Sequence, residues 1–311
     1  MQVYDVIIAG GGPAGLNAAI VLARSRRKVI VFDNGNQRNI RSRGMHNYLT
    51  RDGIKPIDFL QLARDEARRY RILIKNIEVK SASKNKAGYF EVTDIKGGVY
   101  NAKKILLATG LSDNLPAIEG LENLYGKYVF HCPYCDGWEV RDKRLAVYAR
   151  SKNGVDLAIS LKTWSNLVTL YTDGRKYLKP SELALLEQYE IPVITARIKR
   201  LQTAKDKLRS VVLKDESSHL CEALFFVNGY TQQCALAERL GCTINSKRVV
   251  VTNRLQQTNV PGVFVAGDAS RDMHFVVVAA AEGAKAGVSI NKELQHEEKE
   301  VMNKKSRKKF A

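Results

Sequence analysis

The chain has 311 residues, 45% hydrophobic and 26% charged, the balance of a globular protein with room for about two domains. Its apolar runs are far shorter than the ~20 residues that cross a bilayer. Its start lacks the basic and apolar regions of a signal peptide. We therefore expect a cytoplasmic protein that makes no membrane contact.

The charge of the chain admits two explanations. The formal net charge is +18, and five of the six residues in 304–309 are basic. Such an excess fits an acidic or phosphate-bearing partner, but it also fits a solvated basic surface. The basic run has no interleaved aromatic residues, so nucleic acid is not the expected partner. We expect residues 297–311 to form a frayed, solvated basic tail.

Strand and helix patterns alternate along the chain. A β-branched run at 3–9, a glycine-rich turn, a helix to about Arg24 and an apolar strand at 28–33 form a βαβ unit. The same βαβ pattern occurs again from residue 145, with a strand at 145–149, a helix at 155–164 and a strand at 167–171. The remaining expected segments are a helix at 57–69, strands at 72–74, 89–93, 105–108, 192–194, 211–213, 224–228 and 262–268, and a helix at 276–294. This alternation predicts an α/β protein with parallel sheets.

A glycine motif follows the first strand. Gly10, Gly12 and Gly15 fit the pattern G-x-G-x-x-G between a strand and a helix. Glycines allow a tight turn and close approach of the backbone to a pyrophosphate, which the helix N-terminus attracts. Asp33 ends the second strand, where a carboxylate can accept hydrogen bonds from ribose hydroxyls. The motif predicts a dinucleotide site, without separating FAD from NAD.

Two of the five cysteines are spaced for chemistry. Cys132 and Cys135 are separated by two residues at an expected helix start, where a thiolate is stabilised and thiol–disulfide exchange is favoured. The alternatives are half of a zinc site, for which no further ligands are present at suitable spacing, and an inert buried pair. Asp136 follows directly and can transfer the proton of such an exchange, or simply cap the helix. Cys221, Cys234 and Cys242 are expected to be small hydrophobic residues without a role, and we expect no metal.

These motifs, taken in order, resemble the short type of thioredoxin reductase. The order is the glycine motif, Ala108-Thr109-Gly110, the C-x-x-C-D-G segment and Gly267-Asp268, and the resemblance covers roughly residues 3–296. It implies two dinucleotide-binding, Rossmann-like, three-layer domains, the second inserted in the first. The FAD-binding domain would comprise 1–115 and 244–296. The NAD(P)-binding-like domain, with the cysteines, would comprise 116–243. The resemblance also implies a homodimer.

The resemblance assigns roles to individual residues. Cys135 would lie against the flavin, Cys132 would exchange with the partner disulfide, and Asp136 would act as acid and base. Asp268 would contact the ribityl side of FAD. Segments 32–39 and 45–53 resemble a subgroup that includes dithiol oxidases of small natural products. The FAD-binding set is then Gly10, Gly12, Pro13, Ala14, Gly15, Asp33, Asn34, Arg38, Asn39, His46, Asn47, Thr109, Gly110, Gly267, Asp268, His274 and Phe275.

The second domain departs from the family pattern. Where the family has a second glycine motif, the chain reads Ala149-Arg-Ser-Lys-Asn-Gly154, so side chains stand where the backbone would approach a pyrophosphate. Asp173 follows the next strand and would repel a 2′-phosphate, although Arg150 and Lys152 could attract one. We therefore expect FAD as cofactor and doubt conventional use of NADPH.

Two smaller departures concern the residues around the flavin. The family usually has an Arg-Gln pair after the Gly-Asp segment, where this chain has His274. The dithiol oxidases typically have histidine after the second cysteine, where this chain has Asp136. This second difference favours a disulfide reductase over an oxidase.

The sequence as a whole predicts an FAD-dependent dithiol/disulfide oxidoreductase. Its partner would be a thioredoxin-like protein or a small dithiol or disulfide, with a reduced electron-carrier protein as a possible donor. Three alternatives stay open. They are an NADPH-dependent thioredoxin reductase with an eroded motif, a dithiol oxidase using oxygen, and a flavin-binding redox sensor whose basic tail contacts an acidic partner or nucleic acid.

Overall fold

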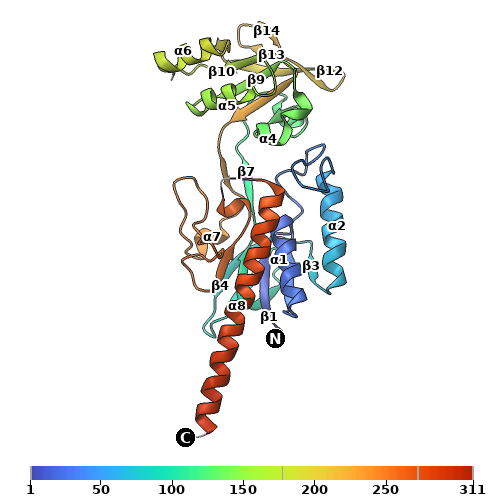
Figure 1. The fold of residues 1–311 in the computed structure, drawn as a ribbon, viewed down its shortest axis with the longest axis vertical. Coiled ribbons are helices and arrows are strands. Elements are labelled where there is room, and N and C mark those ends of the chain that lie inside the picture. Colours follow the sequence, from blue (N-terminus) through green and yellow to red (C-terminus); the bar gives the residue numbers. More distant parts are fainter. Residues whose placement is uncertain (1, 177, 272, 310–311) are drawn as a thin grey trace.

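The chain folds into two α/β domains, stacked along the long axis of the molecule (Figure 1). The computed structural model describes residues 2–176, 178–271 and 273–309. The first domain contains both ends of the chain, and the second is inserted in it. This is the arrangement predicted from the motif order, and the predicted α/β fold class is confirmed.

A parallel sheet forms the centre of the first domain. Its strands run in the order β3-β2-β1-β6-β17, and β6 continues through β5 to β4 as an antiparallel extension. The strands are β1 Val3–Ala9, β2 Val29–Phe32, β3 Leu73–Lys75, β4 Val79–Lys84, β5 Phe90–Asp94, β6 Val99–Leu107 and β17 Val263–Val265.

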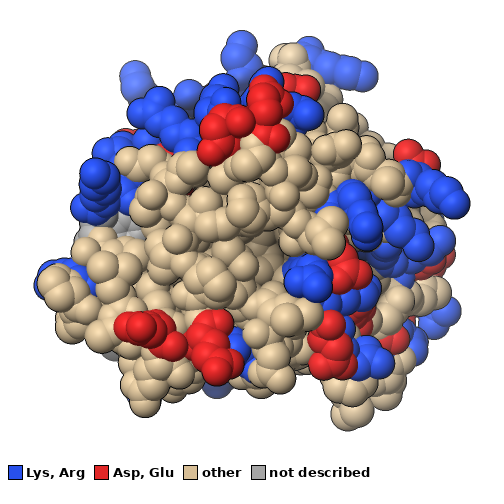
Figure 2. Space-filling view, turned by 90° about the horizontal axis from the view of Figure 1, so that it is seen from above, with Lys and Arg blue, Asp and Glu red and all other residues tan. Residues whose placement is uncertain are grey.

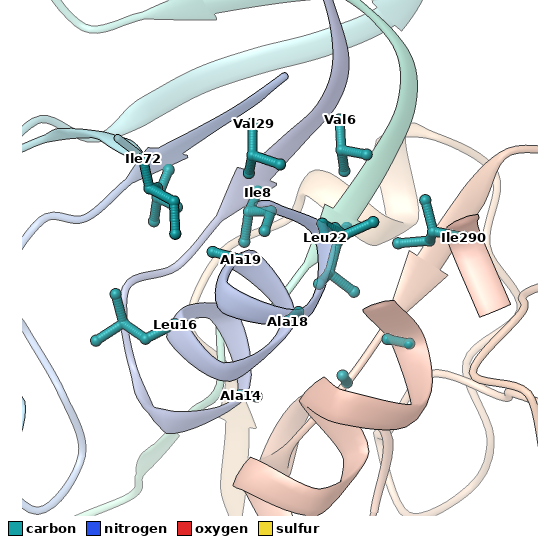
Figure 3. Close-up of a cluster of buried hydrophobic side chains, with 14 of the residues drawn as sticks. Val6, Ile8, Ala14, Leu16, Ala18, Ala19, Leu22, Val29, Ile72 and Ile290 are labelled. Carbon is teal, nitrogen blue, oxygen red and sulfur yellow. The ribbon is translucent and has the colours of Figure 1, made fainter. Parts of the chain in front are cut away.

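Both faces of this sheet are covered, which explains the continuous apolar run in β1. Val6 and Ile8 point towards the helices, among Leu22 and Ile290 (Figure 3). Ile7 and Ala9 of β1 enter a second core on the opposite face. Successive side chains of a strand point to opposite faces, so one short strand contributes to two cores.

Helices α1 Pro13–Arg24, α2 Pro56–Arg69 and α8 Val276–Lys309 cover one face of the first sheet (Figure 1). Small residues let α1 and α8 approach closely. A Cβ at Gly283 would lie 2.0 Å from the carbonyl oxygen of Ala14, and one at Gly287 would lie 2.9 Å from Val21. Asn17 donates to the carbonyl of Ala280 across the same contact at 2.6 Å. The start of α8 is thereby held beside the glycine motif.

Helix α8 is longer than the sequence suggested. We expected it to end at Leu294 and the remainder to fray, but it continues to Lys309 and projects beyond the domain (Figure 1). Buried Lys104 is paired with Glu293 and Glu297, and Arg27 is paired with Glu298. These ion pairs hold the helix to the sheet for one turn past its last buried apolar residue.

The second domain repeats the plan on a smaller scale. A five-stranded parallel sheet, in the order β11-β10-β9-β15-β8, lies between helices and a three-stranded antiparallel sheet. Its strands are β8 Val129–Phe130, β9 Leu145–Ala149, β10 Val168–Tyr171, β11 Val193–Ile194, β12 Ile198–Ala204, β13 Lys207–Leu213, β14 Ser218–Leu220 and β15 Ala223–Val227. Its α-helices are α3 Leu121–Leu124, α4 Pro133–Asp136, α5 Asn153–Leu161 and α6 Pro180–Gln188.

A two-stranded ribbon joins the domains. The chain leaves the first domain through β7 Leu111–Asp113 and returns through β16 Tyr230–Gln232, which pairs with it antiparallel. The short helix α7 Leu236–Arg239 then packs into the core of the first domain. The chain therefore re-enters the first domain before residue 243, where the sequence suggested the boundary. Leu236, Ala237 and Cys242 already belong to the core of the first domain, where they pack with residues of β4 and β5.

Replacing Gly283 by alanine should push α8 away from α1. Overpacking of this kind typically costs ~1–3 kcal/mol, so we expect a clear loss of stability. Urea unfolding measures this effect. Val288→Ala, at an exposed position of the same helix, is the matched control. Unchanged stability of Gly283→Ala would contradict the close contact.

Candidate active site

One cavity lies where the two domains meet. It contains about 1290 Å³ of space, part of it open to solvent, and both domains contribute to its wall. The first domain supplies the glycine motif, the start of α8 and the segment around Arg38. The second supplies Phe130, His131, Cys135 and Asp136.

The glycine motif forms the floor of the cavity. Gly10 has a φ of +114°, and a Cβ there would lie 2.1 Å from the carbonyl oxygen of Ala108. A Cβ at Gly12 would have only Gln37 nearby, at 4.0 Å, so this side of the turn faces open space. Helix α1 begins at Pro13, directly after it, and directs its free N–H groups to that space. The turn therefore fits a dinucleotide pyrophosphate.

Asp33 is buried at the end of β2, and both of its oxygens already have partners. Oδ1 accepts from the backbone N–H of Gly35 at 3.0 Å and from Nε2 of Gln37 at 2.8 Å. Oδ2 is paired with Arg64 of α2. The motif did not indicate Arg64 or Gln37, since neither occupies a position in its pattern. A ribose bound here would share the carboxylate with these two side chains.

The Gly-Asp segment is held in place by the start of α8. Gly267 has a φ of +80°, and its N–H donates to Glu282 at 2.9 Å. Glu282 also pairs with Arg271. His274 contacts the carbonyl of Arg271 through Nε2 at 2.8 Å, and its ring lies edge-on to Tyr230. These contacts place Asp268, His274 and Phe275 on the cavity wall.

Cys132 and Cys135 form a disulfide in a tight turn at the start of α4. Cys135 lines the cavity, whereas Cys132 lies outside its lining. The turn is packed on Trp164: a Cβ at Gly137 would lie 2.8 Å from that ring, and Tyr134 meets it edge-on. The two cysteines are thus placed differently, because Cys135 contributes to the cavity wall and Cys132 does not.

Asp136 lies next to the cysteines on the cavity wall. Removal of its carboxyl from water, reinforced by the charge of Glu139, raises its pKa to about 7, while His46 acts in the opposite direction. A group with a pKa near neutrality can both give and take a proton in cells. This property suits the proton transfer that thiol–disulfide exchange requires.

A buried network around Asp113 connects the two domains. Arg38 of the first domain binds both oxygens of Asp113 on β7, and its third nitrogen lies 3.3 Å from Asp268. Tyr125 of the second domain donates to Asp113 at 2.5 Å, and Nδ1 of His131 is 3.6 Å from it. Burial alone would raise the pKa of Asp113, but hydrogen bonds from Arg38 and Tyr125 and the positive charge of Arg38 lower it. This carboxylate is therefore ionised.

His131 is kept neutral in the same network. Burial, followed by the positive charge of Arg38, lowers its pKa to about 4. The imidazole next to Cys132 is therefore uncharged near neutral pH, and Asp136 is the nearby group that titrates in that range. No motif in the sequence indicates His131 or Tyr125, because their contacts depend on β7 crossing between the domains.

The structure brings most of the residues indicated by the sequence onto this one cavity. Those on its wall are Gly10, Gly12, Pro13, Ala14, Asp33, Asn34, Arg38, Asn39, His46, Thr109, Gly110, Cys135, Asp136, Gly267, Asp268, His274 and Phe275. Gly15 is outside the lining, because it packs beneath Gly10. Asn47 is also outside it and donates to the carbonyl of Tyr134 at 2.8 Å.

The corresponding loop of the second domain carries charged and polar side chains where the first domain has glycines. It joins β9 to α5 through Arg150, Ser151 and Lys152, which lie at the surface. Asp173, after β10, accepts from Tyr148 at 3.2 Å and from the backbone N–H of Ile198 at 3.0 Å, and it lies 3.9 Å from Arg150. Its carboxylate therefore lies beside this loop, within 4 Å of Arg150.

The three free cysteines lie outside the lining of this cavity. Cys221 and Cys242 are buried, and burial raises the pKa of Cys221 to about 12. Within the described ranges, no three His, Cys, Asp or Glu side chains gather as metal ligands. No helix in these ranges is long and apolar enough to span a bilayer.

Removing the cation of the interdomain network should be costly. Arg38→Met leaves Asp113 buried without its partner, and breaking such a pair typically costs ~3–5 kcal/mol. Denaturant unfolding at saturating FAD measures this effect. Arg41→Met is the control, because Arg41 pairs with Glu122 at the surface and exposed pairs contribute at most about 1 kcal/mol. Equal effects of the two changes would contradict the network.

The raised pKa of Asp136 predicts a pH-dependent effect on stability. The unfolded carboxyl ionises near its ordinary value of 3.8, whereas the folded one stays protonated up to about pH 7. The folded state is therefore disfavoured increasingly as pH rises from about 4 to 7. Asp136→Asn should stabilise the protein by about 1–3 kcal/mol at pH 8 and scarcely at pH 4. A gain that is the same at both pH values would contradict this assignment, and Asp156→Asn, at an exposed site on α5, is the control.

Comparison with known proteins agrees with this geometry. Residues 4–283 match the family described as pyridine nucleotide-disulphide oxidoreductase. A probable thioredoxin reductase of Arthroderma benhamiae is 32% identical, over 96% of this chain and 82% of that protein. Thioredoxin reductase tcpT of Claviceps purpurea is 33% identical, over 94% of this chain and 95% of that one.

Solved structures show the same likeness over the whole chain. The crystal structure of HlmI superimposes with a TM-score of 0.95 at 34% identity, covering 99% of this chain and 98% of that one. The match therefore includes both domains and the ribbon between them. The chain belongs to the pyridine nucleotide-disulphide oxidoreductase family and is a flavin-dependent disulfide oxidoreductase of the thioredoxin-reductase type.

Proposed function

We propose that this enzyme relays electrons between FAD, the Cys132–Cys135 disulfide and an external dithiol or disulfide, without conventional use of NADPH. The observation that carries the proposal is the shared cavity, lined by the glycine motif, Asp268 and Cys135 but not by Cys132. When bound, FAD supplies a two-electron acceptor and donor beside Cys135.

The roles of the two cysteines follow from their positions relative to the cavity, since Cys135 lines it and Cys132 does not. Cys132, outside the cavity, is the one that forms a mixed disulfide with the partner. Cys135 exchanges electrons with the cofactor, and Asp136 holds or releases the proton. Exchange of this kind is most favourable for a thiolate at a helix start, and Cys132 immediately precedes α4.

The second-domain loop supports the part of the proposal that concerns NADPH. A glycine-poor turn cannot bring its backbone as close to a pyrophosphate as the first motif does. Asp173 would repel a 2′-phosphate, and Arg150 lies close enough to Asp173 for part of its charge to be offset. One observation favours a second function, that of an NADPH-dependent reductase. Arg150 and Lys152 are exposed on this loop and could bind a nucleotide phosphate.

The partner is best sought among acidic dithiol or disulfide compounds and thioredoxin-like proteins. The chain carries a net charge of +18, and Lys and Arg side chains lie along the upper and right-hand parts of the face at the second-domain end, with Asp and Glu side chains among them (Figure 2). Opposite charge on a partner would speed its encounter with this face. A reduced electron-carrier protein as donor, a homodimer and a cytoplasmic location complete the proposal. The free thiols Cys221, Cys234 and Cys242 fit a reducing compartment.

An anaerobic reduction experiment tests this function. Dithiothreitol should bleach the bound flavin, whereas NADPH and NADH added separately should not. Cys135→Ser should abolish the bleaching by dithiol because the link to the cofactor is removed. Cys221→Ser, at a buried thiol outside the site, is the control. Fast and stoichiometric bleaching by NADPH would instead establish an NADPH-dependent reductase.

A further inference from the structure

A loop of the first domain reaches the cysteine turn of the second. This loop, residues 44–53, is closed by backbone hydrogen bonds between Met45 and Ile54 at 2.8 Å and between Gly53 and Met45 at 2.9 Å. From it, Asn47 donates to the carbonyl of Tyr134, between the two cysteines. His46 extends from the same loop towards the residues that follow Cys135. The loop thus contacts the redox turn at two points.

His46 lies between two carboxylates that come from different domains. Its Nδ1 is 3.4 Å from Asp52 of the same loop, and its Nε2 is 3.3 Å from Glu139 after the cysteine turn. Asp52 is itself fixed by the backbone N–H of Asn47 at 3.0 Å, and this bond and the contact with His46 lower its pKa. The ring of His46 thus bridges the loop of the first domain and the segment that follows the cysteine turn.

Glu139 affects both residues: its carboxylate lies 3.3 Å from Nε2 of His46, and its charge raises the pKa of Asp136. His46 and Asp136 both line the cavity, and Glu139 is three residues beyond Asp136. The groups that face Asp136 come from three segments: Glu139 from its own turn, His46 from the loop, and Tyr125 from the segment after α3. The first two have opposite effects on its ionisation, and the phenol of Tyr125 stays protonated because burial and Asp113 raise its pKa.

We propose that His46 is a positioning residue for thiol–disulfide exchange: it offsets the charge of Glu139 and thereby sets when Asp136 releases its proton. The inference rests on the proposed function and adds a residue to it. The contact between His46 and Glu139 crosses the domain boundary, so it exists only while the cysteine turn is docked on the first domain. The acid/base property of Asp136 is then coupled to that docking.

The step concerned can be written in full. A thiol of the external dithiol attacks Sγ of Cys132, forms a mixed disulfide, breaks the Cys132–Cys135 bond and releases Cys135 as thiolate. The proton of the attacking thiol passes to the carboxylate of Asp136. The second thiol of the dithiol then displaces Cys132, so the external dithiol leaves oxidised and the enzyme pair is left reduced. The rate of opening should rise as Asp136 becomes ionised.

The test measures this opening directly, without relying on turnover of the flavin. The FAD-loaded protein is mixed anaerobically with dithiothreitol from pH 5 to 9, and new thiols are trapped by alkylation and counted by intact mass. His46→Gln should move the midpoint of the rate profile upward by about one pH unit, because Glu139 then acts unopposed. Glu139→Gln should move it downward, and the double variant should lie between the two.

Matched controls and outcomes separate this inference from the proposed function. His296→Gln and Glu300→Gln remove an exposed His–Glu pair on α8, with 3.8 Å between its charged atoms, and should leave the midpoint unchanged. Flavin content and unfolding temperature show that each variant is folded. Normal opening with no opposite shifts would overturn the role of His46 alone. A wild-type disulfide that dithiothreitol does not open would overturn the proposed function and this inference together.

Discussion

The buried ion pair between Arg38 and Asp113 connects the parts of the molecule on which the site depends. Asp113 lies on the strand that leaves the first domain, and Arg38 projects from the first domain's own cofactor segment. Tyr125 of the second domain completes the set of donors. A buried carboxylate with this many partners is costly to rearrange, because each lost bond leaves a charge unsatisfied in a medium of low polarity. The relative position of the two walls of the cavity follows from this contact.

The site contains two aspartates with opposite properties. Asp113 is ionised by its cationic and hydroxyl donors, whereas Asp136 has carboxylate and imidazole neighbours but receives no such set of donors and titrates near neutrality. Divergent pKa values in one site separate structural from proton-transferring groups. His131, next to Cys132, is neutral near pH 7, whereas Asp136 titrates in that range.

Much of the architecture could be predicted, because it depends on local patterns. Strand β1, helix α1 and strand β9 occur where their periodicity placed them, and the turn at Gly10 needs a residue without a side chain. The short strands of the antiparallel parts, such as β12 and β14, were missed or shortened. Their pairing is between distant segments and carries no periodic signal. Helix α8 was underestimated, since its last docked turn is held by ion pairs rather than by an apolar stripe.

The site residues also fall into those that a local pattern predicts and those that depend on contacts between distant segments. Residues in glycine and cysteine motifs were found because their chemistry requires a fixed spacing. Tyr125, His131 and Glu139 act through contacts across the domain boundary, which no spacing along the chain reveals. Asn47 was assigned to the cofactor from its segment, yet its side chain binds the cysteine turn.

The central claim is that the disulfide and the flavin form one electron-transfer unit across the shared cavity. An anaerobic dithionite titration of the purified protein tests it most directly. The account predicts uptake of two electrons by the disulfide and two more by the flavin, with long-wavelength charge-transfer absorption when the cysteines alone are reduced. Uptake of only two electrons, with no such absorption and no new thiols, would show that the cysteine pair and the flavin are not coupled.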